Sequence, residues 1–236
     1  VKMTDDGPFA VSESTVYRIL KHRGLIRPRP LEERPAGKEW SHKTSRVDEI
    51  WQTDATHFLV KGWGRYKAIP VLDDYSRKLM AMPMKPDETG GSISDALEEA
   101  LENAEKEGHN GTGMPVLLSD NGPGFAGGEL AGYLRARSMR HIFGAPYHPQ
   151  TQGKVERLNR KLKNWVSKVT IETPFDLERS FKSFIEGYNM TPHETLKNVS
   201  PNDVYAGRKE DVLSRRARMK WKTMWRRRRI NLAGAA

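Results

Sequence analysis

The order of strand-like and helix-like stretches between residues 50 and 189 most constrains the fold of this chain. Three apolar, strand-like runs come first, and turn-forming residues separate them, so they predict an antiparallel meander. Helices and short strands then alternate, and two helices end the series. The expected strands are about 50–60, 66–73, 78–84, 114–119 and 139–143, and the expected helices are 92–107, 127–137, 152–169 and 174–189. This order predicts an α/β domain with a mixed five-stranded sheet flanked by helices.

Two of the expected helices have clear apolar faces. In the helix over 92–107, small and apolar residues recur every three to four positions, from Ile93 to Ala104. The helix over 152–169 has a narrower seam, made of Val155, Leu158, Leu162, Trp165 and Val169. We therefore expect both helices to pack against the sheet through these faces.

Three carboxylates occur in three different settings. Asp54 ends the run Trp-Gln-Thr-Asp inside the first strand-like stretch, Asp120 follows a short buried strand in Ser-Asp-Asn-Gly, and Glu156 lies one turn into a basic helix. Each has an ordinary interpretation, respectively a solvated strand face, a turn residue and a surface glutamate. Carboxylates brought together from separate elements can instead hold two divalent cations for phosphoryl transfer.

The residues around these carboxylates carry a resemblance. The chain resembles the catalytic core of bacterial insertion-sequence transposases of the retroviral-integrase type over about residues 47 to 207. In that superfamily 35 residues separate the second aspartate from the glutamate, and residues 121–155 number 35 here. The resemblance implies a ribonuclease-H-like (integrase catalytic core) fold. It is carried by Trp51-Gln52-Thr53-Asp54-Ala55-Thr56, Val71-Leu72-Asp73-Asp74-Tyr75-Ser76-Arg77, Ser119-Asp120-Asn121-Gly122 and Tyr147-His148-Pro149-Gln150-Thr151-Gln152-Gly153-Lys154-Val155-Glu156-Arg157-Leu158-Asn159.

The resemblance also implies an activity. A transposase of this kind cleaves transposon ends and joins their 3′-hydroxyls to target DNA, and it needs two Mg²⁺ ions per active site, which Mn²⁺ can replace. Asp54 would bridge both metals, and Asp120 and Glu156 would each complete one site. The implied partners are the terminal inverted repeats, the target DNA and further copies of the chain, as a homodimer or higher oligomer on DNA. The implied location is the bacterial cytoplasm, in association with the nucleoid.

Several basic and amide side chains are candidates for DNA contact, although a solvated helix face is an equally good interpretation of the helical ones. Asp73 and Asp74, in the turn after the second strand-like run, are expected to be structural. His148 is expected to position DNA or its own loop, because metal ions would activate the nucleophile. The candidates for DNA contact are His148, Gln152, Lys154, Arg157, Asn159, Arg160, Lys163, Arg226, Arg227, Arg228 and Arg229.

Positive charge is concentrated at the carboxyl end. Residues 208–236 contain eleven basic and two acidic residues, a net charge of +9 out of +10 for the whole chain. Such a segment contacts phosphate or a membrane surface, or is simply a solvated arm. Phosphate contact is favoured, because Trp221 and Trp225 can stack on bases, although these indoles can also dock the segment on the core.

The amino-terminal part has a different composition. Residues 12–23 predict a short helix that Ser12 or Ser14 caps and Gly24 ends. This helix resembles the last helix of a helix-turn-helix module, or it is a packing helix. We expect a partial DNA-binding segment over 1–26, a proline-containing linker over 27–46, the catalytic core over 47–207 and a basic tail over 208–236. The start at Val1 rather than Met is consistent with a fragment whose upstream domain is missing.

Composition narrows the alternatives. With no cysteine in 236 residues, the chain has no disulfide and no Cys-based zinc site, which disfavours a retroelement integrase with a His/Cys zinc domain. We expect no membrane partner, since no stretch reaches the about 20 apolar residues that span a bilayer. A domesticated, inactive DNA-binding protein is disfavoured by the intact carboxylate triad. An RNA-cleaving nuclease of the same fold is disfavoured by the run Tyr147 to Gly153.

Overall fold

The computed structural model describes residues 5–7, 10–26, 43–109, 113–144 and 153–233. Its centre is a five-stranded sheet in the order β5-β4-β1-β7-β8. Strands β1 and β4 pair antiparallel, as do β4 and β5, whereas β7 and β8 run parallel to β1 and to each other. The predicted mixed sheet is therefore confirmed. Its strands are β1 (Ile50–Thr53), β4 (Val71–Asp73), β5 (Leu79–Ala81), β7 (Val116–Ser119) and β8 (His141–Phe143).

The first three strand-like runs are each broken in two, which the sequence prediction missed. Their remaining halves form a second sheet in the order β2-β3-β6, made of Thr56–Val60, Gly64–Ala68 and Met84–Lys85. Pro70 and Pro83 lie at two of the breaks, and proline cannot donate a hydrogen bond to a strand ladder. The third break lies at Asp54 and Ala55. The chain therefore leaves the central sheet at Asp54 rather than running straight through it.

The predicted turns are confirmed. Gly62 and Gly64 have φ angles of +83° and +120°, and the Trp63 amide donates to the Val60 carbonyl at 3.0 Å, which closes the β2–β3 hairpin. Between β4 and β5, Asp73 accepts hydrogen bonds from the amide and the hydroxyl of Ser76 at 2.7 and 2.6 Å. Asp73 is completely buried, so its expected structural role is supported.

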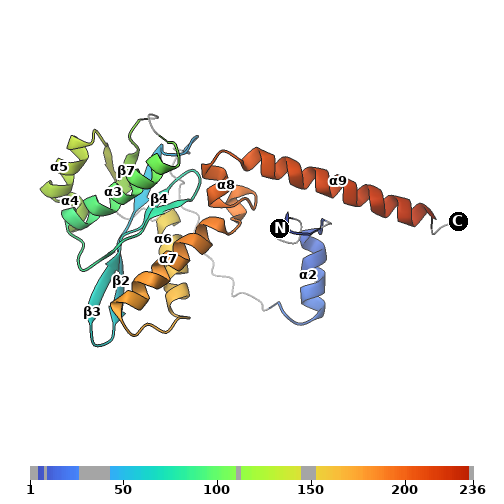
Figure 1. Ribbon diagram of the computed structural model, residues 1–236, viewed down its shortest axis with the longest axis horizontal. Coiled ribbons are helices and arrows are strands. Elements are labelled where there is room, and N and C mark those ends of the chain that lie inside the picture. The colour runs from blue at the N-terminus through green and yellow to red at the C-terminus, as the bar shows by residue number, and fades with distance from the viewer. Residues whose placement is uncertain (1–4, 8–9, 27–42, 110–112, 145–152, 234–236) are drawn as a thin grey trace.

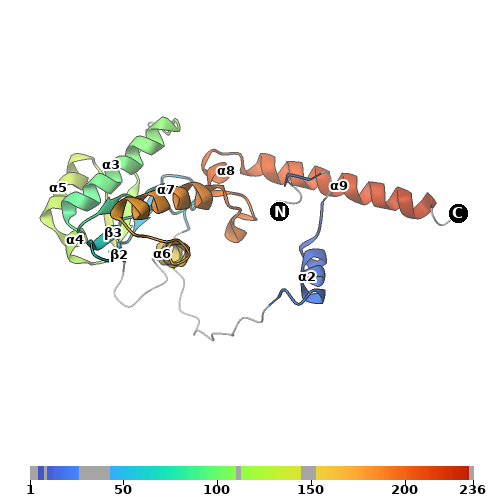
Figure 2. The same cartoon turned by 60° about the horizontal axis from the view of Figure 1, so that its bottom comes forward.

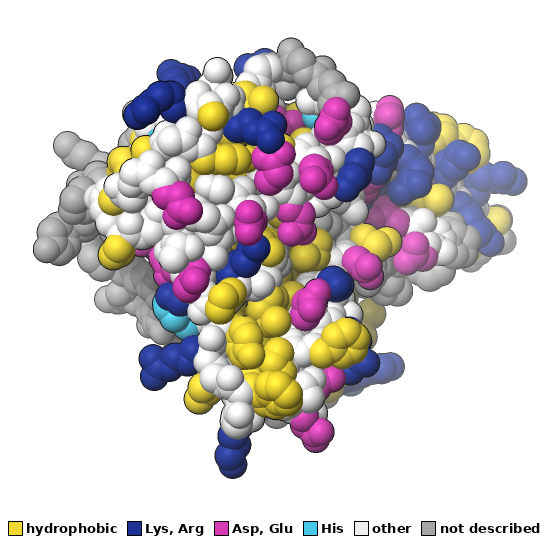
Figure 3. Space-filling model, turned by 60° about the vertical axis from the view of Figure 1, so that its left-hand side comes forward, with side chains coloured by type: hydrophobic (Ala, Val, Ile, Leu, Met, Phe, Trp, Pro, Cys, Tyr) yellow, Lys and Arg dark blue, Asp and Glu magenta, His cyan; other side chains and the backbone are white. Residues whose placement is uncertain are grey.

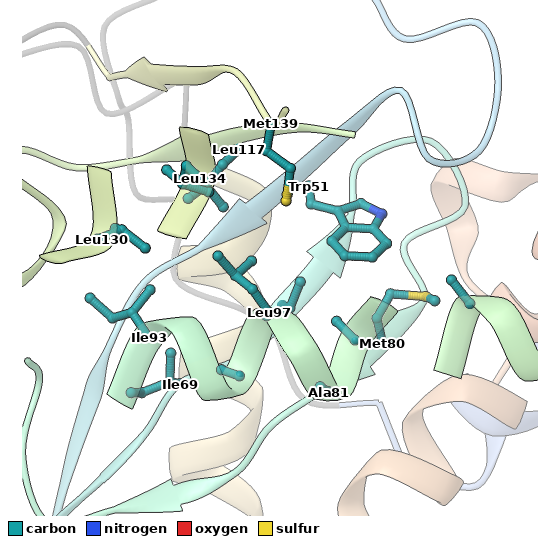
Figure 4. Packing of buried hydrophobic residues seen from close by; sticks show 14 of the residues in the cluster. Trp51, Ile69, Met80, Ala81, Ile93, Leu97, Leu117, Leu130, Leu134 and Met139 are labelled. Carbon is teal, nitrogen blue, oxygen red and sulfur yellow. The ribbon is translucent and has the colours of Figure 1, made fainter. Parts of the chain in front are cut away.

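Helices cover both faces of the sheet (Figure 1). On one face, α3 (Gly90–Lys106), α4 (Pro123–Ala126) and α5 (Gly128–Ala136) meet the sheet in an apolar cluster around Trp51, Leu97 and Leu117 (Figure 4). On the other face, α6 (Gly153–Val166) and α7 (Pro174–Met190) pack on Leu72 and Leu79. Successive side chains of a strand point to opposite faces of the sheet, so neighbouring residues belong to the apolar clusters on the two faces. Because both faces are covered by helices, the strands are apolar throughout.

The helix predictions are confirmed with small changes of bounds. The expected face of α3 is buried, with Leu101 only partly covered. Helix α6 ends at Val166, so Trp165 and Val169 of the expected seam are 40% and 43% exposed, while its three earlier members are buried. The seam is shorter than predicted because α7 and the second sheet cover only the first three turns of α6.

The terminal segments lie on the side of the molecule away from the central sheet. Helix α2 (Glu13–His22) is capped by the Ser12 hydroxyl, which accepts from the Thr15 amide, and Gly24 with φ of +65° follows its end. After the short elements η1 (Glu194–Leu196) and α8 (Pro201–Tyr205), the basic tail is a helix, α9 (Lys209–Ala233). Figures 1 and 2 show α9 projecting from the body, with α2 below it and the segment that leads into α2 near α9. No helix in the described ranges is both long and apolar enough to cross a membrane.

Candidate active site

Asp54 and Asp120 leave neighbouring parallel strands at the same edge of the sheet. Strands β1 and β7 pair with Gln52 opposite Leu118, so the residues two positions further along, Asp54 and Asp120, follow side by side. Both side chains are partly exposed at this edge. Ligand sites of α/β sheets collect at the carboxyl ends of parallel strands. The predicted pair therefore has the right placement for a shared site.

Helix α6 is hydrogen-bonded to strand β1 and to Asp54, which follows that strand. The Val155 amide donates to Oε1 of the buried Gln52 side chain at 3.3 Å. One turn further along, Nδ2 of Asn159 donates to Oδ2 of Asp54 at 3.0 Å. Glu156 lies between these two contacts on the chain and is exposed. These two hydrogen bonds fix the position of α6 relative to β1. They thereby bring Glu156, the third predicted carboxylate, to the same edge of the sheet.

The electrostatics of Asp54 report this convergence. Burial raises the pKa of Asp54 to about 6, the nearby charge of Asp120 adds to the rise, and the hydrogen bond from Asn159 opposes it. Glu88 and Glu156 raise the same pKa through their charges. The charges of three other carboxylates therefore act on Asp54. Among the residues that the structure describes, no group of three or more acidic or histidine side chains is placed to hold one metal ion.

A tight turn orients Asp120. Its Oδ1 accepts from the Gly122 amide at 2.9 Å, which is the local turn that the Ser-Asp-Asn-Gly run favours. Helix α4 follows, and Gly124 in it lies against the backbone of Glu88, where a Cβ atom would be 1.9 Å from the Glu88 carbonyl oxygen. Only glycine fits this contact. The turn therefore packs the loop carrying Glu88 against the loop carrying Asp120.

Glu88 is the residue of the site that the sequence reasoning missed. Its Oε2 receives a salt bridge from Nζ of Lys67 at 2.9 Å, and its Oε1 lies 3.5 Å from the position that a Cβ on Gly122 would take. No motif or spacing distinguishes Glu88 from the other acidic residues. It reaches the site because the loop before α3 packs against α4, which only the tertiary structure determines.

The predicted DNA-contact residues of α6 differ in their surroundings. Asn159, which was predicted to contact DNA, is only 6% exposed and donates a hydrogen bond to Asp54. Lys154 is partly buried and its Nζ donates to Oδ2 of Asp74. Arg157, Arg160 and Lys163 are exposed.

The remaining candidates lie in two other places. Arg226, Arg227, Arg228 and Arg229 are exposed on α9. His148 and Gln152 lie outside the described residues. DNA contact by all these side chains stays a prediction.

Asp74 has a structural environment, as expected. Its Oδ1 accepts from Nε2 of Gln52 at 2.6 Å and its Oδ2 accepts from Oγ1 of Thr44 at 2.6 Å, in addition to the bond from Lys154. Gln52 therefore joins Asp74 to the start of α6. This chain of hydrogen bonds holds the helix that carries Glu156 in place relative to the strand that leads to Asp54.

Two models of the integrase core domain match the chain, over residues 44–149 and 137–201. The Gag-Pro-Pol polyprotein of squirrel monkey retrovirus is 32% identical over 120 residues, and the Pol-related polyprotein of the mouse intracisternal A-particle is 34% identical over 122 residues. Each match covers 51% of this chain. The chain spans 6% and 13% of the lengths of these two relatives.

Solved structures show the same fold. The HTLV-2 integrase catalytic core domain in complex with magnesium superposes with a TM-score of 0.54 and 20% identity, over 69% of this chain and 99% of that one. The integrase of a simian T-cell lymphotropic virus intasome superposes with a TM-score of 0.59 and 23% identity, over 83% of this chain and 67% of that one. Together with the sheet order and the family models, this likeness confirms the ribonuclease-H-like fold. The chain therefore contains a catalytic core of the integrase and transposase type.

Proposed function

We propose that this protein is a transposase that cleaves the ends of a mobile element and joins their 3′-hydroxyls to target DNA. The observation that carries the proposal is the convergence of Asp54, Asp120 and Glu156 at one edge of an integrase-type core. The four sequence motifs support the transposase assignment. The core type supports phosphoryl transfer between polynucleotides.

The residues at this edge fit divalent cations. Aspartate and glutamate oxygens are the ligands that Mg²⁺ prefers. The pKa of Asp54 is raised first by burial and then by the negative charges of Asp120, Glu88 and Glu156, all of which a bound cation would offset. Oδ1 of Asn159 is also buried beside Asp54 with no hydrogen-bond partner among the described residues. An unneutralised carboxylate group with an unused amide oxygen is an environment that a cation stabilises.

We infer that Asp54, Asp120 and Glu156 hold two Mg²⁺ ions. When bound, such a pair activates the attacking hydroxyl or water and stabilises the leaving oxygen. Asn159 holds the Asp54 carboxylate in one orientation, and Gln52 fixes the helix that carries Glu156. The proposed reaction needs no covalent enzyme intermediate, so it needs no serine or tyrosine nucleophile.

A retroelement integrase is the second candidate, because the curated relatives are retroviral polyproteins. The joining step is shared by both classes, so the carboxylates do not separate them. The two candidates differ in the DNA ends that they process. A transposase must cleave ends embedded in flanking donor DNA, whereas a retroelement integrase acts near the termini of a linear DNA.

The proposal predicts a specific pattern of activity. Labelled duplexes with candidate terminal repeats should be joined to plasmid DNA in Mg²⁺ or Mn²⁺, and EDTA should stop the reaction. Asp54→Asn, Asp120→Asn and Glu156→Gln should each abolish joining while leaving the fold intact, because each removes a ligand charge and little volume. The matched control is Glu105→Gln, an exposed carboxylate on α3, which should join DNA like the wild type.

Two outcomes would count against the proposal. Joining at the wild-type rate by any one triad variant would remove that residue from the active site. Joining of pre-cut linear ends together with no cleavage of embedded ends would favour the retroelement integrase. Mass measurement of the DNA complex would test the proposed dimer or higher oligomer.

A further inference from the structure

The segment before α2 is attached to α9 by a partly buried ion pair. Asp5 accepts two hydrogen bonds from Arg216, from Nε to Oδ1 at 2.8 Å and from Nη2 to Oδ2 at 2.7 Å. The two side chains are only 19% and 16% exposed. Arg216 also donates from Nη1 to the Asn198 carbonyl at 2.9 Å. A two-pronged, partly buried contact of this kind is directional and stronger than an ordinary surface ion pair.

Two further contacts extend the attachment. The Ala10 amide donates to Oγ1 of Thr223 at 3.0 Å, two turns beyond Arg216 on α9. Nδ2 of Asn198 donates to Oε1 of Glu13 in the first turn of α2 at 3.3 Å. Contacts at Asp5, Ala10 and Glu13 therefore fix the path into α2. These contacts also explain how α2 is held near α9 although none of the residues of α2 is buried.

The contact with Arg216 favours the ionised form of Asp5. The hydrogen bonds from Arg216 hold the pKa of Asp5 below its usual value, and the charges of Arg216 and Arg215 act in the same direction. The carboxylate therefore stays ionised at neutral pH and available to the guanidinium group. Its neighbour Asp6 is exposed and carries the same formal charge.

The two attached helices present basic side chains together. Arg18, Lys21 and Arg23 are exposed on α2 or at its end. Beyond the attachment, α9 carries Lys222 and the four arginines 226–229. Lys and Arg side chains are dense towards α9, whereas acidic side chains gather over the core (Figure 3). In Figures 1 and 2 both helices lie on the side away from the sheet.

We propose that the Asp5–Arg216 contact is a clasp that anchors the segment before α2 on α9, so that the two helices keep a fixed relative position and together bind the phosphate backbone of duplex DNA. The surface that they form is separate from the carboxylate edge of the sheet. The inference rests on the proposed function for its partner, since that function requires the chain to hold duplex DNA. Asp5 is a positioning residue in this arrangement and does not touch the DNA.

The clasp predicts that removing the charge of Asp5 weakens DNA binding, which is the opposite of what net charge alone predicts. Removing a negative charge from a DNA-binding protein ordinarily tightens binding. Asp5→Asn in the full chain should instead weaken binding of a labelled duplex by at least about threefold, because the cations of α2 lose their fixed position. If the three basic residues of α2 stop contacting phosphate, the slope of log K against log salt should become shallower by up to about 3. Fluorescence anisotropy over a range of salt concentrations measures both.

Asp6→Asn is the matched control, with the same charge change one residue away. It should bind duplex as tightly as the wild type or more tightly. Amide hydrogen exchange without DNA gives a second readout, in which residues 10–25 should exchange faster in Asp5→Asn and unchanged in Asp6→Asn. Circular dichroism should show the same core unfolding transition for all three proteins.

The possible outcomes test the Asp5–Arg216 clasp and the binding of duplex DNA separately. Equal DNA binding and equal exchange in the two variants would overturn the clasp. Faster exchange in Asp5→Asn with unchanged duplex binding would overturn the shared DNA surface and leave the proposed joining activity in place. Competition by phosphatidylserine vesicles at equal anionic charge would show a lipid partner instead. A wild-type chain that binds no duplex would overturn both this surface and the proposed function.

Discussion

At the scale of single residues, the surroundings of Asp54, a proposed metal ligand, differ from those of Asp73, a structural aspartate. Asp73, only a short distance away in the sheet, also has a pKa raised to about 6 by burial, but three hydrogen bonds from protein groups surround it. Within the described residues Asp54 accepts one side-chain hydrogen bond, from Asn159, and the charges of other carboxylates act on it. A buried carboxylate with few protein donors and several like charges has an energetic need for a cation.

The charge of Asp54 should therefore destabilise the metal-free protein. Its pKa is 3.8 in the unfolded chain and about 6 in the folded protein, so the destabilisation is absent below pH 3.8, grows as the pH rises towards 6, and is complete above 6. Asp54→Asn should remove it. The gain in free energy of unfolding at pH 8 has an upper limit of about 3 kcal/mol, at about 1.4 kcal/mol per pKa unit.

Thermal unfolding in EDTA between pH 4.5 and 8 tests this. The stability difference between Asp54→Asn and the wild type should increase with pH, and Glu105→Gln should show no such increase. Added Mg²⁺ should stabilise the wild type more than Asp54→Asn, because a ligand that binds only the folded state stabilises it. A variant that is less stable than the wild type at every pH would contradict this account of the site.

At the scale of elements, the site depends on a close contact between two loops. Gly124 in α4 lies against the Glu88 carbonyl, and this contact joins the loop before α3 to the turn that orients Asp120. Gly132 in α5 has no atom within 4 Å of the position that a Cβ would take. The two glycines are close in sequence, but only the first is required by packing.

Gly124→Ala should displace α4, because its Cβ would overlap a backbone oxygen. We expect a loss of about 1 to 3 kcal/mol in the free energy of unfolding, together with a large loss of DNA joining. Gly132→Ala should instead gain up to about 1 kcal/mol, since alanine favours the helical state over glycine. Chemical denaturation and the joining assay measure the pair. Equal stability of the two variants would mean that α4 shifts freely.

Helix α9 combines a structural part and a basic part. Val212 and Leu213 pack with Leu196 and Val204, whereas residues 225–233 are exposed. Deleting 225–236 should therefore leave the unfolding midpoint unchanged and make the salt slope of DNA binding shallower by up to about 3.6, at about 0.9 for each of four arginines. Salt-dependent anisotropy is the measurement. An unchanged slope would identify this end of α9 as a solvated arm.

At the scale of the whole molecule, the proposed carboxylate site lies in the body that contains the sheet, and α2 and α9 lie to one side of that body (Figure 1). One site holds one reacting phosphate, whereas a mobile element has two ends to join. The proposed function therefore requires at least two copies of the chain on DNA. The predicted linker over 27–46 would let copies exchange contacts, although residues 27–42 lie outside the described structure.

Native mass measurement should show two or more copies of the chain bound to paired end duplexes. Without DNA we expect a monomer, since the sequence has no long apolar heptad to form a dimer seam. Asp120→Asn should assemble like the wild type, because assembly does not require the reaction. A monomeric complex that joins both ends in a coordinated way would exclude this arrangement.

The sequence by itself determined the fold class, the order of the elements and the three carboxylates. Apolar periodicity marks α3 and α6, and the turns at Gly62, Gly64 and Asp73 follow from local backbone preferences. These features depend on neighbours along the chain, so a single sequence contains them.

Tertiary structure alone decided the contacts between distant segments. Asn159 shares the polar pattern of α6 with Arg160, yet the position of β1 turns it into a partner of Asp54. Glu88 joins the site through the contact with Gly124. Asp5 meets Arg216 across more than 200 residues. Such contacts arise from how elements pack in three dimensions, and local periodicity carries no information about that packing.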